Sequence, residues 1–214
     1  MISALDRPHV WLPGPGGPPL LLLHGTGGDE NDLLPLRAHL APDAPVLSVR
    51  GAVLENGMPR FFRRLREGVF DEDDLRARVD ELAEFLAAAE HVYGVDPGAW
   101  TAVGFSNGAN IASALLLRRP PALTAAVLLA AMVPFGVPPT ADLAGKRVAV
   151  VNGRRDPMAT AEHTDVLASQ LRDRGADVTV LWHDGGHTID PAQLSAIAAF
   201  VRAGYVGRRP SDGR

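Results

Sequence analysis

The chain has 214 residues, a formal net charge of -4 and a mean hydropathy close to zero, with 46% hydrophobic and 21% charged residues. This length suits one domain that buries roughly 70% of its extended-chain surface, and the weak acidity gives no reason to expect nucleic acid as a partner. The absence of cysteine excludes disulfides, thiolate metal sites and a cysteine nucleophile, and it fits a reducing compartment.

The first residues of the chain do not suggest targeting. Residues 1–8 contain no basic segment followed by an apolar core, so we expect no signal peptide and a cytoplasmic protein. The longest uncharged stretch, 123–140, is broken by Pro134 and Gly136, which favours a buried strand and a loop over a membrane span. We expect a single domain over residues 1–206, followed by a frayed tail at 207–214.

Short apolar runs alternate with helical periodicity along the chain, which is the pattern of a mostly parallel α/β sheet. The expected strands cover residues 9–12, 20–23, 45–49, 100–103, 125–131, 148–151 and 178–182. The first two flank a Pro/Gly-rich turn and are expected to form an antiparallel pair. Helices are expected around 75–92, where apolar residues recur at helical spacing, over 109–117, and after Asp190-Pro191.

One pentapeptide carries most of the functional information: Gly104-Phe105-Ser106-Asn107-Gly108. An apolar run leads into it and a helix-like run leads out, which is the strand, sharp turn and helix context of a nucleophile elbow. The turn forces the serine into a strained backbone conformation, so small neighbours are needed for strand and helix to pass close together. Ser106 is therefore the expected nucleophile.

Two further residues follow strands downstream. Asp156 comes just after the apolar run 148–151, and His187 just after 178–182, so the order Ser, Asp, His is that of an α/β hydrolase. A serine hydroxyl needs a base, and the base needs a group that fixes its tautomer; we assign these roles to His187 and Asp156. The alternatives are a solvated loop histidine and a turn-forming aspartate. His183 and His187 are four residues apart, which could suggest a pair of metal ligands. No third ligand is evident, so we expect no metal.

An acyl-transfer site also needs donors for the oxyanion. In this topology they are backbone N–H groups, one from the residue after the nucleophile and one from the loop after an early strand. Asn107 and Thr26, the latter in His24-Gly25-Thr26-Gly27-Gly28, are the expected donors. His24 is expected to support this loop without taking part in the chemistry. Phosphate binding is disfavoured, because the loop lacks a P-loop lysine and a Gly-x-Gly-x-x-Gly spacing.

The segment 51–68 shows neither helical nor strand periodicity and is expected to be an irregular insertion beside the site. Its Met58, Phe61 and Phe62, together with Met132, are predicted to line a shallow substrate pocket. For Phe61 and Phe62 the alternative is that they fill the core.

With these motifs, the chain resembles the phospholipase/carboxylesterase family of serine α/β hydrolases. The resemblance rests on the His-Gly-x-Gly-Gly-Asp segment at 24–29, the elbow, the Gly-x-x-Asp-Pro segment at 153–157 and the Gly-His pair at 186–187. The segments 29–33, 56–62 and 132–134 resemble its MhqD-like carboxylesterase branch, which is associated with quinone and catechol responses. The resemblance implies an α/β-hydrolase fold with a mostly parallel sheet of about seven strands, flanked by helices and without a separate cap domain.

The resemblance also implies carboxylic-ester hydrolysis, with Ser106, Asp156 and His187 as the triad and Thr26 and Asn107 as oxyanion donors. We expect a cofactor-independent serine esterase that acts on small or medium acyl esters through an acyl-enzyme, with no membrane association. Because many relatives pair, a homodimer is a further expectation. The alternatives are an acyl thioesterase or lysophospholipase on the same scaffold, which would need a long apolar groove, and a non-catalytic binding protein.

Overall fold

The computed structural model describes residues 5–203 and Tyr205. The predicted tail at 207–214 lies outside the described residues. The strands are β1 (His9–Leu12), β2 (Leu20–Leu23), β3 (Val46–Val49), β4 (Val53–Glu55), β5 (Met58–Arg60), β6 (Arg64–Arg66), β7 (Val69–Phe70), β8 (Thr101–Phe105), β9 (Ala125–Leu129), β10 (Arg147–Gly153) and β11 (Asp177–His183). The helices are α1 (Leu36–Leu40), α2 (Glu72–Tyr93), α3 (Asn107–Arg118), α4 (Ala161–Arg172) and α5 (Leu194–Ala203), with short 3-10 turns at Pro120–Ala122 and Pro191–Gln193.

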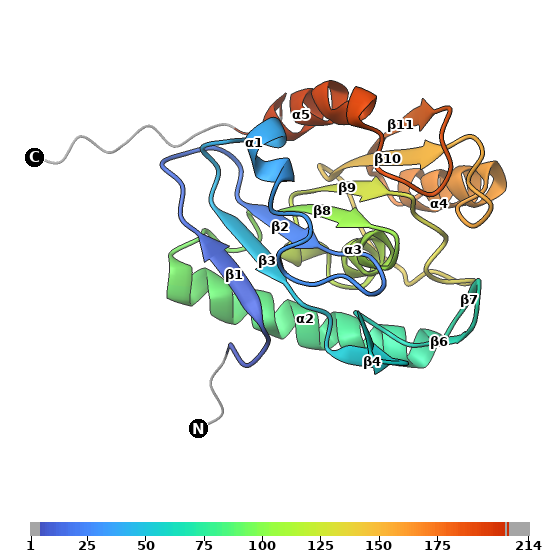
Figure 1. The fold of residues 1–214 in the computed structure, drawn as a ribbon, viewed down its shortest axis with the longest axis horizontal. Coiled ribbons are helices and arrows are strands. Elements are labelled where there is room, and N and C mark those ends of the chain that lie inside the picture. The colour runs from blue at the N-terminus through green and yellow to red at the C-terminus, as the bar shows by residue number, and fades with distance from the viewer. Residues whose placement is uncertain (1–4, 204, 206–214) are drawn as a thin grey trace, which may run out of the picture.

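Seven strands form the central sheet in the order β1-β3-β2-β8-β9-β10-β11 (Figure 1). All neighbouring pairs are parallel except β1 with β3. The predicted α/β-hydrolase fold with a mostly parallel sheet is confirmed. The chain runs from β2 to β3 on one side and then returns to β8 on the other, so β2 and β8 flank the point where the strand order reverses. Binding sites of open α/β sheets form at such a switch point, beyond the carboxyl ends of the strands.

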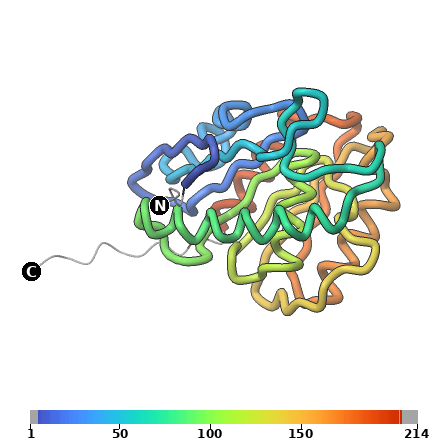
Figure 2. The backbone as a smooth tube through the Cα atoms, turned by 90° about the horizontal axis from the view of Figure 1, so that it is seen from below, coloured from blue at the N-terminus to red at the C-terminus, as the bar shows by residue number. Residues whose placement is uncertain are grey.

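Strands β2 and β9 are apolar throughout because helices cover both faces of the sheet. In β2, Leu21 and Leu23 pack in one core cluster with α2, α3 and α4, whereas Leu20 and Leu22 pack in a second cluster with α1 and α5. Figure 1 shows α1 and α5 together on one side of the sheet, and Figure 2 shows the long helix α2 crossing the opposite side. The alternation of the strand side chains therefore fills two separate layers.

The predicted antiparallel pairing of the first two strands is wrong. β1 pairs with β3, with His9 opposite Val49, and β2 lies between β3 and β8. The physical reason is burial: all four residues of β2 are fully buried and need a neighbour on each side, whereas β1 is only partly buried and suits the edge.

The insertion is more regular than the sequence predicted. Strands β4 and β5 form one antiparallel hairpin, and β6 and β7 form a second. The first turns at Asn56 and Gly57, whose φ angles of 51° and 79° suit the type I′ turn that Asn-Gly favours. That dipeptide was the signal for a hairpin. Beyond these hairpins, no additional domain covers the carboxyl edge of the sheet within the described residues.

The helices expected from the sequence are confirmed. Helix α2 begins after Asp71, whose side chain accepts a hydrogen bond from the amide of Asp74, and it ends at Gly94 in the left-handed conformation. The side chain of Asp190 accepts a hydrogen bond from the amide of Ala192 and so caps the turn before α5. Within the described part of the chain, no helix has both the length and the apolar character that crossing a bilayer requires.

Candidate active site

Ser106 lies at a sharp turn between β8 and α3. Its φ of 53° and ψ of -113° are strained for a residue with a side chain, as expected for a nucleophile elbow. A Cβ atom at Gly104 would lie 2.4 Å from the carbonyl oxygen of Gly108, and one at Gly108 would lie 2.0 Å from that of Leu23. Glycine at both positions is what lets the helix begin directly against two strands.

The structure brings Ser106, His187 and Asp156 into one hydrogen-bonded chain. Nε2 of His187 lies 2.8 Å from Oγ of Ser106, and Nδ1 lies 2.7 Å from Oδ2 of Asp156. Because an ionised carboxylate only accepts, the proton of a neutral His187 lies on Nδ1. Nε2 is then free to accept the proton of Ser106. The side chain of Asp156 is fully buried, whereas that of His187 keeps 19% of its surface exposed.

Backbone contacts hold together the loop that carries Asp156 and the loop that carries His187. The amide of Arg154 donates to the carbonyl of His183, and the amide of Arg155 donates to that of Gly185. A Cβ at Gly153 would lie 2.4 Å from the carbonyl oxygen of Gly186, so glycine is required for this approach. On the other side, the ring of His187 packs against Phe105, with 5.3 Å between ring centroids.

His183 packs inside the loop that carries His187. It is buried, and its Nδ1 accepts a hydrogen bond from the amide of Gly185, which helps to shape the turn that carries His187. Across the part of the chain that the structure describes, no three His, Cys, Asp or Glu side chains gather in a way that could hold a metal ion.

The loop after β2 runs beside Ser106. No described residue accepts a hydrogen bond from the amide of Thr26 or from that of Asn107, the two amides expected to face an oxyanion. The next amide, of Gly27, is taken by the carbonyl of Pro59. The loop therefore leaves one backbone donor free where it passes the nucleophile.

His24 supports this loop from below, as expected from the sequence. It is buried, its Nε2 accepts a hydrogen bond from the amide of Gly51, and its Nδ1 lies 2.6 Å from the carbonyl oxygen of Gly25. The first contact requires an unprotonated Nε2, so Nδ1 carries the proton. Burial lowers the pKa of His24 below its ordinary value, an effect that outweighs the contact with the Gly25 carbonyl and the acidic residues nearby.

A cavity of about 210 Å³ opens beside Ser106 and His187. Its lining residues are Thr26, Arg60, Arg64, Glu67, Gly68, Phe70, Phe105, Ser106, Asn107, Asn110, Met132, Met158 and His187. Of the four residues predicted to form the pocket wall, Met132 lines this cavity. Met58 does not: it is 39% exposed and its sulfur lies near Gly27.

The prediction that Phe61 and Phe62 line the pocket is wrong, and the alternative that they fill the core is right. Both side chains are fully buried within the cluster that includes α2 and α3. The other polar residues of the cavity, above all Arg60 and Asn110, were missed. Arg60 stands next to the two phenylalanines in the insertion, and Asn110 lies one helical turn after Ser106, so sequence position was the only available signal.

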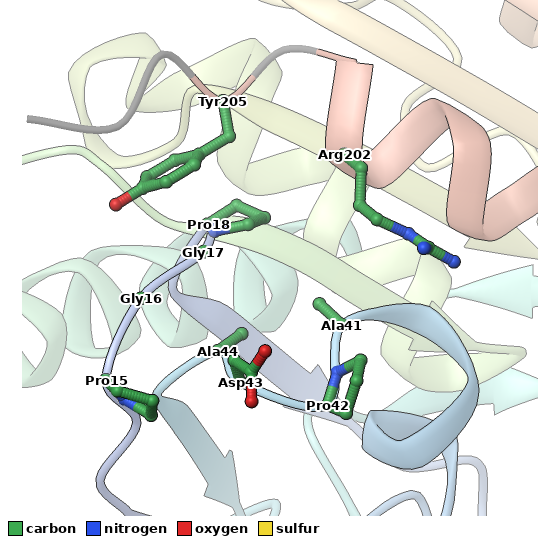
Figure 3. Close-up of a pocket in the computed structure, with 10 residues that line it drawn as sticks. All are labelled: Pro15, Gly16, Gly17, Pro18, Ala41, Pro42, Asp43, Ala44, Arg202 and Tyr205. Atoms are coloured by element: carbon green, nitrogen blue, oxygen red, sulfur yellow. The ribbon is translucent and has the colours of Figure 1, made fainter.

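A second cavity, of about 500 Å³, shares no lining residue with the first, and Figure 3 shows the residues around it. It is lined by residues 15–18, by 41–44, and by Arg202 and Tyr205. The first two segments directly precede β2 and β3, so this cavity lies at the amino ends of the strands, opposite the edge that carries Ser106. Proline, glycine and alanine make up most of its wall, and no group there resembles a nucleophile with a base.

Fold and site together define the class: this is a serine hydrolase with an α/β-hydrolase fold. The chain belongs to the FSH1 serine hydrolase family, whose model matches residues 68–200. It is 49% identical over 181 residues to the MhqD protein of Bacillus subtilis (strain 168). These residues cover 85% of this chain and 90% of that protein.

Solved structures of carboxylesterases are similar to it. The Bacillus cereus carboxylesterase shares 45% sequence identity with a TM-score of 0.91, over 93% of this chain and 95% of the other. A carboxylesterase from Mesorhizobium loti shares 30% identity with a TM-score of 0.87, over 92% of this chain and 94% of the other. The predicted resemblance to carboxylesterases and to the MhqD branch is confirmed.

Proposed function

We propose that this protein hydrolyses small carboxylic esters through an acyl-enzyme intermediate on Ser106. The observation that carries the proposal is the hydrogen-bonded chain from the Ser106 hydroxyl through His187 to the buried Asp156. It supplies a nucleophile, a base in the tautomer that can accept a proton, and a carboxylate that stabilises the resulting imidazolium.

The reaction begins when Nε2 of His187 takes the proton of Ser106 and Oγ attacks the ester carbonyl carbon. The carbonyl oxygen becomes an oxyanion, which the free amides of Thr26 and Asn107 stabilise. The carbon–oxygen bond to the alcohol then breaks, and the leaving alkoxide takes the proton from Nε2. A water molecule repeats the sequence on the acyl-enzyme, which releases the acid and returns the proton to Ser106. One such amide donor typically contributes about 2.7–4 kcal/mol to lowering the barrier.

The cavity favours short acyl groups. Its volume of about 210 Å³ lies below the ~300–1,000 Å³ typical of sites for drug-sized ligands. Phe70, Phe105, Met132 and Met158 provide apolar walls, so small acyl groups fit while a long chain would extend into solvent. This supports an esterase for small substrates over the alternative of a lysophospholipase or long-chain thioesterase.

Labelling with a fluorophosphonate probe tests the proposal directly. We expect stoichiometric modification of Ser106, a burst of nitrophenol from p-nitrophenyl acetate, and loss of about six decades of turnover in Ser106→Ala. Ser169→Ala, on the exposed side of α4, is the matched control and should behave as the wild type. Retained turnover in Ser106→Ala would rule out this nucleophile, and an unlabelled wild type would favour a non-catalytic binding protein.

A series of acyl esters and acyl-CoAs of increasing chain length separates the ester and thioester alternatives. A maximum at two to four acyl carbons on the oxygen esters supports the proposal, whereas a maximum at long thioesters contradicts it. The single domain over residues 1–206, the independence from cofactors and metals, the homodimer and the cytoplasmic location stay predictions from the sequence.

A further inference from the structure

The polar groups at the floor of the active-site cavity are hydrogen-bond donors whose acceptor ends are already occupied. Asn107, only 2% exposed, accepts a hydrogen bond on Oδ1 from the amide of Phe61 at 2.7 Å. Since a backbone amide can only donate, this contact fixes which end of the side chain is oxygen. The other end, Nδ2, is buried and has no hydrogen-bond partner among the described residues.

Asn110 repeats the arrangement one helical turn further on. It is 4% exposed, and its Oδ1 accepts a hydrogen bond from the amide of Met132 at 2.8 Å. Its Nδ2 therefore carries the hydrogens, it belongs to a residue that lines the cavity, and no described residue accepts from it. Of these two side-chain amides, only that of Asn110 can present a donor to the cavity, because Nδ2 of Asn107 is closed off from solvent.

Arg60 adds a buried positive charge to the same wall. It is 3% exposed, its Nη1 donates to Oγ1 of Thr26 at 2.7 Å, and its Nε donates to the carbonyl of Phe62 at 3.1 Å. Nη2 has no partner among the described residues. Because the Thr26 hydroxyl already accepts from Arg60, its own proton is available to a ligand.

The carboxylates nearby only partly balance this charge. Glu55 lies between two guanidinium groups, with Oε2 3.1 Å from Nε of Arg60 and Oε1 2.8 Å from Nε of Arg64. Arg60, Arg64 and Glu55 together carry one net positive charge, and the formal charge reaches zero only when Glu67 is counted. Glu67 also lines the cavity, but its side chain is exposed at the rim.

We propose that the preferred substrates are short esters whose acid part carries a second carboxylate, such as monoesters of small dicarboxylic acids. A carboxylate offers about four lone-pair positions, which can accept from Nδ2 of Asn110, Nη2 of Arg60 and the hydroxyl of Thr26. Buried donors without acceptors are costly, and hydrogen bonds to an ionised group are among the strongest in proteins. This inference rests on the proposed ester hydrolysis and names its substrate class.

We place the second carboxylate in the acyl part of the substrate. Asn110 lies one helical turn after Ser106 and both residues line the cavity, so the donor of Asn110 lies on the side of the carbon that bonds to Oγ. The cavity of about 210 Å³ has room for a short dicarboxylic acid but not for a bulky one.

Three ethyl esters of matched shape test the inference: monoethyl succinate, its neutral amide ethyl succinamate, and the apolar ethyl 4-methylpentanoate. At about pH 7.5 we expect kcat/KM for the anionic ester to exceed that for each neutral ester by roughly tenfold or more. Equal or lower values for the anion would overturn the inference. A second pair of esters, carboxymethyl acetate and propyl acetate, carries the variation in the alcohol part. If the enzyme prefers carboxymethyl acetate over propyl acetate but does not prefer monoethyl succinate over the neutral ethyl esters, the anion binds on the alcohol side and the inference is overturned.

Two substitutions of Asn110 locate the preference. Asn110→Asp keeps the oxygen that accepts from Met132, and Asn110→Leu keeps the size while removing the donor. We expect both to lower the ratio of kcat/KM for monoethyl succinate over ethyl 4-methylpentanoate by roughly tenfold. Asn56→Asp, which adds the same charge at the exposed tip of the first hairpin, is the control and should leave the ratio unchanged.

A substitution of Glu67, the carboxylate at the rim of the cavity, is expected to change the ratio of kcat/KM values in the opposite direction. Glu67→Gln should raise the same ratio, because it removes a charge that repels the anion. Thermal denaturation of each variant confirms folding, and a ratio that does not respond to either Asn110 substitution would overturn the inference. Failure of the esterase itself is distinguishable, because the apolar ester would then not be hydrolysed and Ser106 would not be labelled.

Discussion

The two oxygens of the Asp156 carboxylate have different partners, and only one of them faces His187. Oδ2 lies 2.7 Å from Nδ1 of His187, whereas Oδ1 accepts hydrogen bonds from the amides of Met158 at 2.8 Å and Ala159 at 3.0 Å. The turn that follows β10 therefore holds the carboxylate in one orientation. Because that orientation is fixed, so is the direction in which the imidazole faces Ser106.

Asp156→Asn should abolish most activity without changing the fold. The amides of Met158 and Ala159 require an oxygen at their end, so the new NH₂ group would face Nδ1 of His187. Nδ1 must then accept, which moves the imidazole proton to Nε2, where it blocks proton transfer from Ser106. We expect kcat for p-nitrophenyl acetate to fall about 10⁴-fold with a nearly unchanged melting temperature. A fall of less than tenfold would contradict the role proposed for Asp156.

Gly108→Ala should destabilise the protein. The added methyl group would lie 2.0 Å from the carbonyl oxygen of Leu23, so α3 must move away from β2. We expect the free energy of unfolding in urea to decrease by about 3 kcal/mol, and turnover to fall with it because Ser106 shifts. Gly16→Ala is the control, since no atom lies within 4 Å of the place its methyl group would take, and the free energy of unfolding should change by no more than about 0.5 kcal/mol.

Phe62→Ala should behave as a core mutation. The ring is fully buried and contacts Phe70 edge to face, with 5.0 Å between centroids. Its removal is expected to cost about 3–5 kcal/mol in the free energy of unfolding. Met58→Ala, in the same insertion but 39% exposed, should cost less than about 1 kcal/mol. Similar urea midpoints for the two variants would show that Phe62 does not belong to the core.

Acid should destabilise the fold through His24. Burial lowers its pKa in the folded state, so the unfolded chain binds the proton more readily than the folded one. The contribution of His24 to the free energy of unfolding is therefore complete above the unfolded pKa of about 6.5 and decreases as the pH falls below it. We expect the urea midpoint to drop between about pH 7.5 and pH 5.

His24→Gln should reduce that drop, because the titrating group is gone. His39→Gln, an exposed histidine on α1, should retain the full drop and serves as the control. Identical pH profiles for wild type and His24→Gln would refute the assignment to His24.

Much of the fold could be predicted because the central strands are buried on both faces. A run such as Leu20–Leu23 has no polar position, and its shortness and the Pro and Gly residues that flank it favour an interior strand between two layers. Pairing was less predictable, because nothing within His9–Leu12 specifies β3 rather than β2 as its neighbour. The short hairpins of the insertion were missed because three-residue strands are too brief to show a period, although Asn56-Gly57 marked one of the turns.

The reacting residues could be located from the sequence because each follows the end of an apolar run of strand length. Ser106, Asp156 and His187 then meet because carboxyl ends of parallel strands share one edge. The pocket wall could not be found in this way, because it depends on which side of the insertion faces the site. Adjacent residues separate there: Arg60 lines the cavity while Phe61 and Phe62 enter the core.

That separation of adjacent residues has a consequence for protein engineering. The stretch 58–62 holds the Thr26 loop through Pro59 and Arg60 and fills the interior with its two aromatic rings. A library that randomises this stretch to obtain new selectivity would mostly yield misfolded members. Arg64, Glu67 and Phe70 line the same cavity from the second hairpin without being fully buried, so diversity introduced there can alter substrate choice at little cost in foldability.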